Sequence, residues 1–419
     1  MRYLICLLAF GLSWGSAQAQ EVLLRHALEG RALAALGELT LKFNDEQKGK
    51  AKVVLQGVAG LEQVTPLPHV AFLDSDDSMV FFGTRPRFLP IAQVMAQGKE
   101  KFSDKQIFPQ AADAVDDLAG KVGALPMGLS LPVLFYSKDA FRKVGLDPES
   151  PPKTWWELQK VAGLLFDAGY KCPLTASGFS WVHLENNASQ AGEPVLFKDG
   201  KVERLSYNSM VNVKHIALLA SWQKSRYFHW FGGGREGNAR FTSGQCAMLT
   251  GESAFYAEAS RNARFAVGVA ELPYYDDVYG AKQANVLPDG EALWVLAGKK
   301  KEEYRVVARF LAFLLRPENQ KAWVRATGYL PMTPQAVEAL KSDSAVPGLL
   351  DKASERLSHT RFGGARIAEG KGRSRIRAIL NEEIEFVWRN QKPAKEALDT
   401  AVVRANHVLQ QEAGESKRK

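Results

Sequence analysis

The stretch that decides the fold is residues 126–158, which read PMGLSLPVLFYSKDAFRKVGLDPESPPKTWWEL. Its segment Leu131–Tyr136 is short, apolar and aromatic, which predicts a buried strand. Ser137 can cap a helix over Lys138–Val144. The proline-rich segment that follows imposes a loop, and Thr154 can cap the next helix. Taken alone, this order of elements is that of an ordinary α/β protein.

The length and the composition indicate a globular protein of two lobes. A chain of 419 residues is too long for one simple core, and a hydrophobic content of 46% is ordinary for a folded protein. The net charge of +8 is scattered along the chain rather than gathered into a basic stripe, and no zinc-ligand spacing accompanies it. We therefore expect no nucleic-acid partner.

The N-terminus has the pattern of an export signal. Arg2 is followed by the apolar run Tyr3–Trp14 and then by the small-residue cleavage site Ala17–Ala19. We therefore expect residues 1–19 to be a signal peptide and the protein to work in the periplasm. Later apolar runs are too short to cross a bilayer.

Two cysteines remain after the signal is removed, because Cys6 lies within it. They are Cys172 and Cys246. In an oxidising compartment we favour a disulfide between them over two separate buried thiols.

The rest of the chain alternates predicted strands with predicted helices. Strands are predicted at Glu21–Leu24, Ala51–Leu55, Val70–Leu73 and Phe265–Pro273, and helices at Ser206–Trp222, Glu303–Leu315, Glu396–Gln411 and, capped by Ser374, Arg375–Gln391. Strand–helix–strand order favours parallel sheets with right-handed crossovers.

An acidic cluster follows the third predicted strand. Asp74, Ser75 and Asp76 come at the end of that strand, where open α/β sheets bind ligands. The cluster lacks the glycine and the distal glutamate of a calcium loop, so we predict no metal there.

Several motifs resemble those of the extracellular solute-binding proteins of ABC importers (family 1). The segment from Phe135 to Trp155 is similar to the family pattern Y-Y-N-K-D-x-F-x-K-x-G-L-D-P-x-x-P-P-x-T-W, and Ala322–Pro331 (AWVRATGYLP) is similar to W-x-x-x-T-G-Y-L-P. Further matches are HALEG at 26–30, FTSGQCAM at 241–248 and DGEALWV at 289–295. By this resemblance, Phe241–Thr250 and Pro288–Val295 would be two further strands, the second of them the return crossing between the lobes. The resemblance covers nearly all of the chain after the signal.

The resemblance implies a type II periplasmic-binding-protein fold of class α/β, in which two lobes are joined by a hinge. Each lobe would be a mostly parallel sheet flanked by helices. It assigns residues 20–130 and 291–335 to lobe I, and residues 131–290 and 336–419 to lobe II. The lobes would close on a small-molecule ligand, and the closed form would dock on the membrane subunits of an ABC permease. No cofactor is implied, and we expect a monomer.

Most similar are those members of the family that bind sn-glycerol 3-phosphate, and their ligand-binding positions can be carried over one by one. The residues that match are Ser130, Trp181, Ser253, Gly290, Tyr329 and Arg377. Arg377, in the first turn of a predicted helix, would add a charge-assisted donor for an anion. On the alternative interpretation, Arg377 is a solvated helix residue and Tyr329 is the edge of the core.

Other positions depart from the family pattern. A family tyrosine is Leu61 here, and one of two adjacent serines is Glu252, which would repel an anion unless it faces away. The acid that binds glycerol aligns best with Ser75, although Asp74 or Asp76 could substitute. We therefore expect sn-glycerol 3-phosphate or a glycerophosphodiester as the ligand, with an uncharged sugar or polyol as the alternative.

No catalytic constellation stands out. The chain has no G-x-S-x-G elbow, no H-E-x-x-H helix and no nucleotide-binding glycine turn after a predicted strand, and its seven histidines are dispersed. We therefore expect a binding protein rather than an enzyme. The alternatives are an exported phosphodiester hydrolase and a binding module that serves as a sensor partner.

Overall fold

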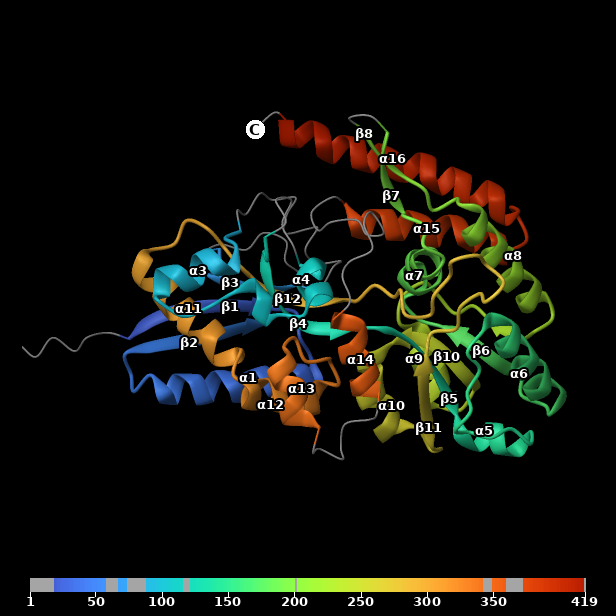
Figure 1. The fold of residues 1–419 in the computed structure, drawn as a ribbon, viewed down its shortest axis with the longest axis horizontal. Coiled ribbons are helices and arrows are strands. Elements are labelled where there is room, and N and C mark those ends of the chain that lie inside the picture. Colours follow the sequence, from blue (N-terminus) through green and yellow to red (C-terminus); the bar gives the residue numbers. More distant parts are fainter. Residues whose placement is uncertain are drawn as a thin grey trace, which may run out of the picture.

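The computed structural model describes residues 19–57, 67–73, 88–115, 121–199, 202–341, 349–358 and 372–417. They form two α/β lobes side by side, each built around its own sheet (Figure 1). The predicted signal and four residues considered above, Leu61, Asp74, Ser75 and Asp76, lie outside the described residues.

The first lobe has a five-stranded sheet in the order β2-β1-β3-β12-β4. Its strands are β1 (Gln20–His26), β2 (Ala51–Gly57), β3 (Val70–Leu73), β4 (Ala124–Ser130) and β12 (Asp289–Val295). Its helices are α1 (Gly30–Glu46), α3 (Ile91–Gly98), η1 (Asp104–Gln106), α4 (Pro109–Ala114), α11 (Lys301–Leu314), α12 (Pro317–Thr327), α13 (Pro334–Leu340) and α14 (Leu349–Ser358). Every residue of β3 is buried, as its wholly apolar sequence predicts.

The second lobe has a five-stranded sheet in the order β11-β5-β10-β6-β9 and a separate hairpin. Its strands are β5 (Pro132–Ser137), β6 (Cys172–Ala176), β9 (Phe228–His229), β10 (Cys246–Glu252) and β11 (Val267–Glu271), and the hairpin is β7 (Leu196–Asp199) with β8 (Val202–Leu205). Its helices are α5 (Lys138–Lys143), α6 (Trp155–Asp167), η2 (Trp181–Glu185), α7 (Asn186–Gln190), α8 (Met210–Lys224), α9 (Glu236–Thr242), η3 (Ser253–Phe255), α10 (Tyr256–Asn262), α15 (Arg373–Trp388) and α16 (Ala394–Lys417).

The chain crosses between the lobes on a strand that is almost continuous. Only Leu131 separates β4 of the first sheet from β5 of the second, and both strands are buried throughout. The backbone of Leu131 is held in both directions, since its N–H donates to Ser253 Oγ at 3.0 Å and its carbonyl accepts from Ser253 N at 2.8 Å. The return strand β12 begins beside it, with Asp289 paired to Ser130. These two strands therefore form the hinge.

The sheets are mixed rather than mostly parallel. In the first sheet β1 runs parallel to β2 and β3, but β12 runs antiparallel to both of its neighbours. In the second sheet β5 runs antiparallel to β10 and β11. The strands that break the pattern, β5 and β12, enter their sheets from the other lobe. The direction of each of these strands is set by the crossing between the lobes, because neither strand is joined to its sheet neighbours by a strand–helix–strand unit.

The packing of the C-terminal third differs from the predicted lobe boundary at residue 336. Val337, Leu340, Ala353 and Leu357, from α13 and α14, lie in the core of the first lobe. The next helices, α15 and α16, pack in the core of the second lobe, at the end drawn in red in Figure 1. We therefore propose that lobe I extends through α14 and that lobe II resumes at α15.

Local signals in the sequence explain several element boundaries. Thr154 begins α6 with a capping box, in which its hydroxyl accepts from Glu157 N and the Glu157 carboxylate accepts from Thr154 N. Ser137 caps α5 in the same manner, with its hydroxyl accepting from Ala140 N. The prediction of a strand over Phe241–Thr250 is wrong in its first part. Phe241 is a buried residue of the short helix α9, and the strand begins only at Cys246.

A disulfide joins Cys172 and Cys246, the pair that the sequence favours. The two residues face each other across the parallel strands β6 and β10. It therefore ties together two strands at the centre of the second sheet.

Candidate functional site

A cavity of about 360 Å³ lies beside the hinge and is lined by residues of both lobes. Its walls are formed by Ser130, Ser177, Gly178, Ser180, Trp181, Gly233, Gly234, Arg235, Glu252, Asp289, Gly290, Glu291, Tyr329, Arg377 and Asn381. A volume of this size suits a small solute. Because the residues come from strand ends, loops and helices of both lobes, relative motion of the lobes would change its shape.

Six of the nine predicted ligand-binding residues line this cavity, namely Ser130, Trp181, Glu252, Gly290, Tyr329 and Arg377. Ser253 does not line it, because its hydroxyl accepts from Leu131 N and holds the crossing strand instead. Asp74 and Ser75 lie outside the described residues. The structure thus gathers residues from six separate parts of the chain into one site.

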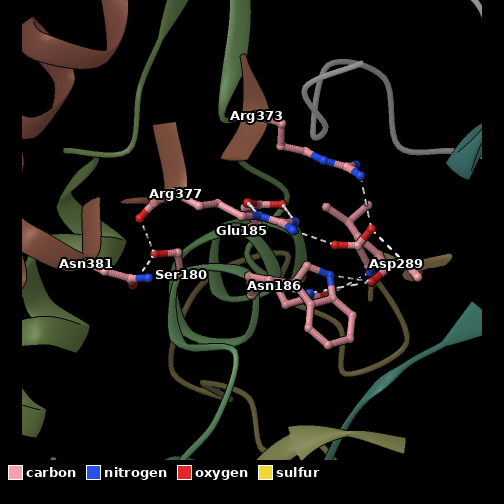
Figure 2. Close-up of polar contacts among 10 residues, drawn as sticks. Ser180, Glu185, Asn186, Asp289, Arg373, Arg377 and Asn381 are labelled. Carbon is pink, nitrogen blue, oxygen red and sulfur yellow. Dashed lines mark hydrogen bonds and ion pairs between the residues drawn. The ribbon is translucent and has the colours of Figure 1, made fainter. Parts of the chain in front are cut away.

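The guanidinium of Arg377 is held between two carboxylates, as Figure 2 shows. Its Nε and Nη2 donate to the two oxygens of Glu185 at 2.7 and 2.8 Å, and its Nη1 donates to Asp289 Oδ2 at 2.6 Å. Arg373 Nη2 donates to the other oxygen of Asp289 at 3.2 Å. Glu185 is 2% exposed, so this cluster is a buried network that fixes the direction of Arg377.

The helix that carries Arg377 begins earlier than predicted. Gly372, with φ of +72°, occupies the cap position in place of Ser374, and Arg373 is the first helical residue. Arg377 therefore falls in the second turn of α15, not in the first. It acts on the site through its own charge, and the unpaired N–H groups of the helix end do not reinforce it.

Two serine hydroxyls in the cavity have no hydrogen-bond partner among the described residues. Ser130 ends β4 of the first lobe and is 2% exposed, and Ser177 follows β6 of the second lobe and is 3% exposed. A buried hydroxyl without a partner costs free energy, and a ligand oxygen in the cavity would restore the missing hydrogen bonds. The pair would bind such a ligand from both lobes at once.

Tyr329 is a polar group of the cavity and not only an edge of the core. Its hydroxyl donates to Glu291 Oε2 at 2.8 Å, and its ring stacks on that of Trp323 with a centroid distance of 6.0 Å. Burial raises the pKa of the Tyr329 hydroxyl well above its usual value, and the carboxylates of Glu291 and Glu252 raise it further. The Tyr329 hydroxyl and the Glu291 carboxylate therefore form one hydrogen-bonded pair in the cavity wall.

Glu252 faces the cavity, but it is paired with a cation. Its carboxylate accepts from Arg235, with Nε 2.8 Å from Oε1 and Nη2 3.4 Å from Oε2. The side chain of Arg235 is 64% exposed, so this pair is not rigidly held. An anion that enters the cavity meets a carboxylate together with a guanidinium that can move.

Trp181 forms an apolar wall whose position is fixed by the segment that precedes β12. Its indole Nε1 donates to the carbonyl of Leu287, and the side chain is only 7% exposed. It begins η2, a π-helical turn that the sequence did not predict. Phe179, two residues earlier, is fully buried against Trp230 and Trp388.

Gly290 has a structural reason to be glycine. Its φ is +144°, and a Cβ atom there would lie 1.7 Å from the carbonyl oxygen of Gly128 on β4. The close approach is therefore to the neighbouring strand of the hinge. The backbone of Gly290 still lines the cavity.

Sequence reasoning missed seven polar residues of the site: Ser177, Ser180, Glu185, Arg235, Asp289, Glu291 and Asn381. Asp289 and Glu291 flank Gly290 in a motif that was recognised, and their charges within a buried strand were a signal that went unused. The glycine-rich segment 232–234 lies between β9 and α9 and borders the cavity, where Gly233 packs closely on Asn381. Glu185 gave no signal, because its partner is far away in the sequence.

Two features of the described residues bear on the class of site. No helix among them is both long and apolar enough to cross a membrane. Within the same residues, no three His, Cys, Asp or Glu side chains are grouped in a way that could hold a metal ion.

Known proteins are similar to this chain in sequence over most of its length. The family model for bacterial extracellular solute-binding proteins matches residues 52–348. The sn-glycerol-3-phosphate-binding periplasmic protein UgpB of Salmonella paratyphi A is 39% identical over 335 residues, which cover 76% of this chain and 75% of that protein. The protein of the same name from Escherichia coli K12 is 34% identical over 435 aligned positions, which cover 98% and 97% of the two chains.

Solved structures share the fold. UgpB from Mycobacterium tuberculosis, in complex with glycerophosphocholine, has a TM-score of 0.73 at 20% identity and covers 94% of this chain and 100% of its own. The maltose-bound MalE3 of T. maritima has a TM-score of 0.74 at 16% identity and covers 93% and 100%. At these identities the likeness is one of architecture, the two-lobe type II fold.

Proposed function

The chain belongs to the bacterial extracellular solute-binding proteins, and from this we propose that it is the substrate-binding component of an ABC importer. Like its relatives it is a periplasmic protein. It captures sn-glycerol 3-phosphate or a glycerophosphodiester between its two lobes and delivers it to the membrane subunits of a permease. Closure is a hinge motion, in which the ligand contacts both lobes only in the closed form.

One observation carries the proposal of capture between the lobes. Ser130 and Ser177, from different lobes, present buried hydroxyls to the same cavity, and within the described part of the chain neither hydroxyl has a hydrogen-bond partner. A phosphate or polyol oxygen placed between them supplies the missing partners, and Arg377 lies on the same wall. The relatives that bear the glycerol-phosphate name supply the choice of ligand, at 34% identity over nearly the whole chain.

The test is a thermal-shift and calorimetric titration of the purified mature protein with glycerol 3-phosphate, glycerophosphocholine and a panel of sugars. A ligand at one hundred times its dissociation constant adds about 2.7 kcal/mol to the free energy of unfolding. We expect both Ser130→Ala and Ser177→Ala to weaken binding roughly tenfold. Ser243→Ala, an exposed serine outside the cavity, is the matched control.

Arg377 is better tested by lysine than by alanine. Alanine would leave the buried Glu185 carboxylate without its cation, which costs about 3–5 kcal/mol and would confuse loss of binding with loss of folding. Lysine keeps the charge but not the two parallel hydrogen bonds. Weaker binding by Arg377→Lys with an unchanged melting temperature would support a role in the site.

An uncharged sugar or polyol is the second candidate ligand. It is favoured by the pairing of Arg377 with Glu185 and Asp289, because both carboxylates already take up its positive charge. A melting shift with sugars alone would select this candidate.

We propose a binding protein and not a hydrolase. Incubation of the protein with glycerophosphocholine should release no choline, with or without a chelating agent. Release that the chelator abolishes would identify a metal-dependent phosphodiesterase and overturn the proposal. We also propose that the protein is a monomer, which light scattering during gel filtration would test.

A further inference from the structure

A groove lies along the outer strand of the second sheet, away from the cavity that both lobes line. Its volume is about 990 Å³, and it shares no lining residue with that cavity. Every residue of β11 lines it, and its walls come from α6, from α10 and from the loop between α5 and α6. In the sheet, β11 stands at the end of the strand order, with α10 close by (Figure 1). The groove therefore follows one edge of a sheet.

The backbone groups on this edge are available to a further strand. Lys138 N donates to the carbonyl of Ala266 at 2.9 Å, and Val267 comes next in the antiparallel register, opposite Ser137. Because bonded and non-bonded pairs alternate along an antiparallel ladder, Val267 and Val269 belong to non-bonded pairs. Their N–H and carbonyl groups point away from β5, toward the groove. No strand of the described chain pairs with them there.

Proteins usually protect such an edge, and the other outer strands among the described residues follow this rule. β2 carries the exposed Lys52, β9 has only two residues, and β4 is buried throughout. β11 reads VGVAE, with neither lysine nor proline, and its single charged residue is Glu271 at its end. A free edge without these protections is a template to which an extended peptide can add.

The two faces of the groove differ, and the difference defines the strand that would be added. The side chains of Val267 and Val269 pack with Tyr256 against a small apolar cluster on one face of the sheet. The other face is bordered by Lys153 and Lys160, which are exposed and belong to the loop before α6 and to α6 itself. Because side chains alternate along a strand, an added strand meets the apolar face with one set and the lysines with the other.

The two lysines also define the charge of the partner. The carboxylates of the groove already have partners within the protein: Asp147 accepts from Ser150, Glu149 pairs with Lys138, Glu157 caps α6 and Glu271 pairs with Arg356. By contrast, none of the carboxylates in the described ranges forms an ion pair with Lys153 or Lys160. An acidic segment would supply the charges that these two cations lack.

We propose that β11 is the docking site for an extended, acidic segment of a partner protein, which joins the second sheet as a further strand. Main-chain hydrogen bonds to Val267 and Val269 hold the segment in register. Its apolar side chains contact Tyr256, and its carboxylates alternate with them and pair with Lys153 and Lys160. This inference goes beyond the proposed function, because the partner docks here without entering the ligand cavity.

The first test uses the unaltered mature protein and a synthetic ten-residue peptide of alternating valine and glutamate with blocked ends. We expect the peptide to bind, as measured by calorimetry, and to slow hydrogen exchange at the amides of Val267 and Val269. The amides of Gly268 and Ala270, which already bond to β5, should change little. Absence of binding at millimolar peptide, or binding that leaves the first two amides unprotected, would overturn the proposal.

Two N-methylated forms of the peptide distinguish strand addition from side-chain contact alone. Methyl groups on every second amide remove the hydrogen-bond donors from one edge of the peptide, and each form carries them on a different edge. We expect the form methylated on the edge that meets β11 to bind at least about tenfold more weakly, and the other form to bind like the parent peptide. Equal affinity of the two forms would contradict the proposal.

The protein edge can be blocked by one substitution. Val269→Pro removes an N–H that points into the groove and leaves the bonds to β5 in place, so the sheet should tolerate it. We expect peptide affinity to fall roughly tenfold with little change in the melting temperature. Val269→Thr keeps both the N–H and the shape of the side chain and is the matched control. Equal affinities of the two variants would argue against the docking site.

The charge of the groove is tested separately. Lys160→Gln should weaken binding of the glutamate peptide roughly threefold and leave unchanged the binding of a peptide with glutamine in place of glutamate. Lys224→Gln removes the same charge from an exposed position at the end of α8, outside the groove, and should change neither affinity. A loss as large in this control would assign the effect to overall charge and contradict the choice of an acidic partner.

Discussion

At the scale of single residues, Gly290 shows how one position joins the hinge to the site. A side chain there would meet the Gly128 carbonyl at 1.7 Å, and the backbone has φ of +144°. We expect Gly290→Ala to lower the free energy of unfolding by roughly 2–4 kcal/mol. Urea unfolding measures the loss. Gly280→Ala, at φ of +80° with nothing within 4 Å, is the control and should cost about 1 kcal/mol.

Two buried histidines should make stability depend on pH. His183 and His215 share a hydrogen bond at 2.9 Å, and each bonds further to a hydroxyl, of Thr250 and Tyr275 respectively. Burial lowers the pKa of His215 to about 3 and that of His183 well below 6.5, the latter helped by its neighbour. The folded protein therefore keeps both rings neutral at a pH where the unfolded chain binds protons.

The sign of this effect follows from the lowered pKa values. The stabilisation is fully present above pH 6.5 and is lost as the pH falls below that value, by about 1.4 kcal/mol per pH unit for each ring. Unfolding free energies between pH 7.5 and 5 measure the slope. His215→Gln should reduce it, whereas the exposed His407→Gln should not. An unchanged slope in the first variant would contradict the explanation.

The residues of the site were predicted unevenly, for a physical reason. Ser130, Tyr329 and Arg377 stand in motifs that are local in sequence, so the resemblance located them. Their partners were not predicted, because the role of a carboxylate such as Glu185 depends on its contact with Arg377, which forms only when the chain folds. The sequence therefore predicted several of the side chains that line the cavity, but not the charged residues that surround them.

At the scale of elements, short-range signals located most boundaries correctly. The buried run of β3, the cap of α5 and the capping box of α6 depend on neighbours within a few residues. Strand direction is a different matter, since β5 and β12 run antiparallel to their neighbours only because they arrive from the other lobe. That information lies in topology, which local patterns do not contain.

The disulfide gives a prediction at this scale. It joins β6 and β10 across 74 positions of the chain, so it restricts the unfolded state considerably. We expect the double variant Cys172→Ala/Cys246→Ala to lose roughly 4 kcal/mol of unfolding free energy on the chain-entropy account. Urea unfolding of both proteins tests this. An unchanged midpoint would mean that the bond contributes little beyond the packing of the two strands.

At the scale of the whole molecule, one ion-pair cluster connects the lobes away from the cavity. Glu271, on β11, accepts from Arg356 at 2.6 Å and from Lys352 at 3.3 Å, and both cations lie on α14. In the sheet β11 and β10 flank the crossing strand on opposite sides, so Glu271 lies across β5 from the cavity residue Glu252. The cluster therefore limits how the lobes rotate about the hinge.

Removal of this connection should be visible in the shape of the protein. We expect Glu271→Gln to cost about 1.5–3 kcal/mol of unfolding free energy and to increase the radius of gyration of the ligand-free protein in X-ray scattering. Glu149→Gln, which breaks an exposed pair with Lys138 inside one lobe, should change neither quantity. If the scattering of the two variants is identical, the cluster does not restrain the lobes.

The order of the elements along the chain has a consequence for folding during synthesis. In the first sheet β12, which begins only at Asp289, lies between β3 and β4. The second lobe is complete only with α15 and α16, near the end of the chain. Because synthesis begins at the N-terminus, neither lobe can finish folding until most of the chain has been synthesised. Such long-range pairing makes folding slow. We expect a chain that stays extended long enough to be threaded through a membrane, and that takes its final form on the far side.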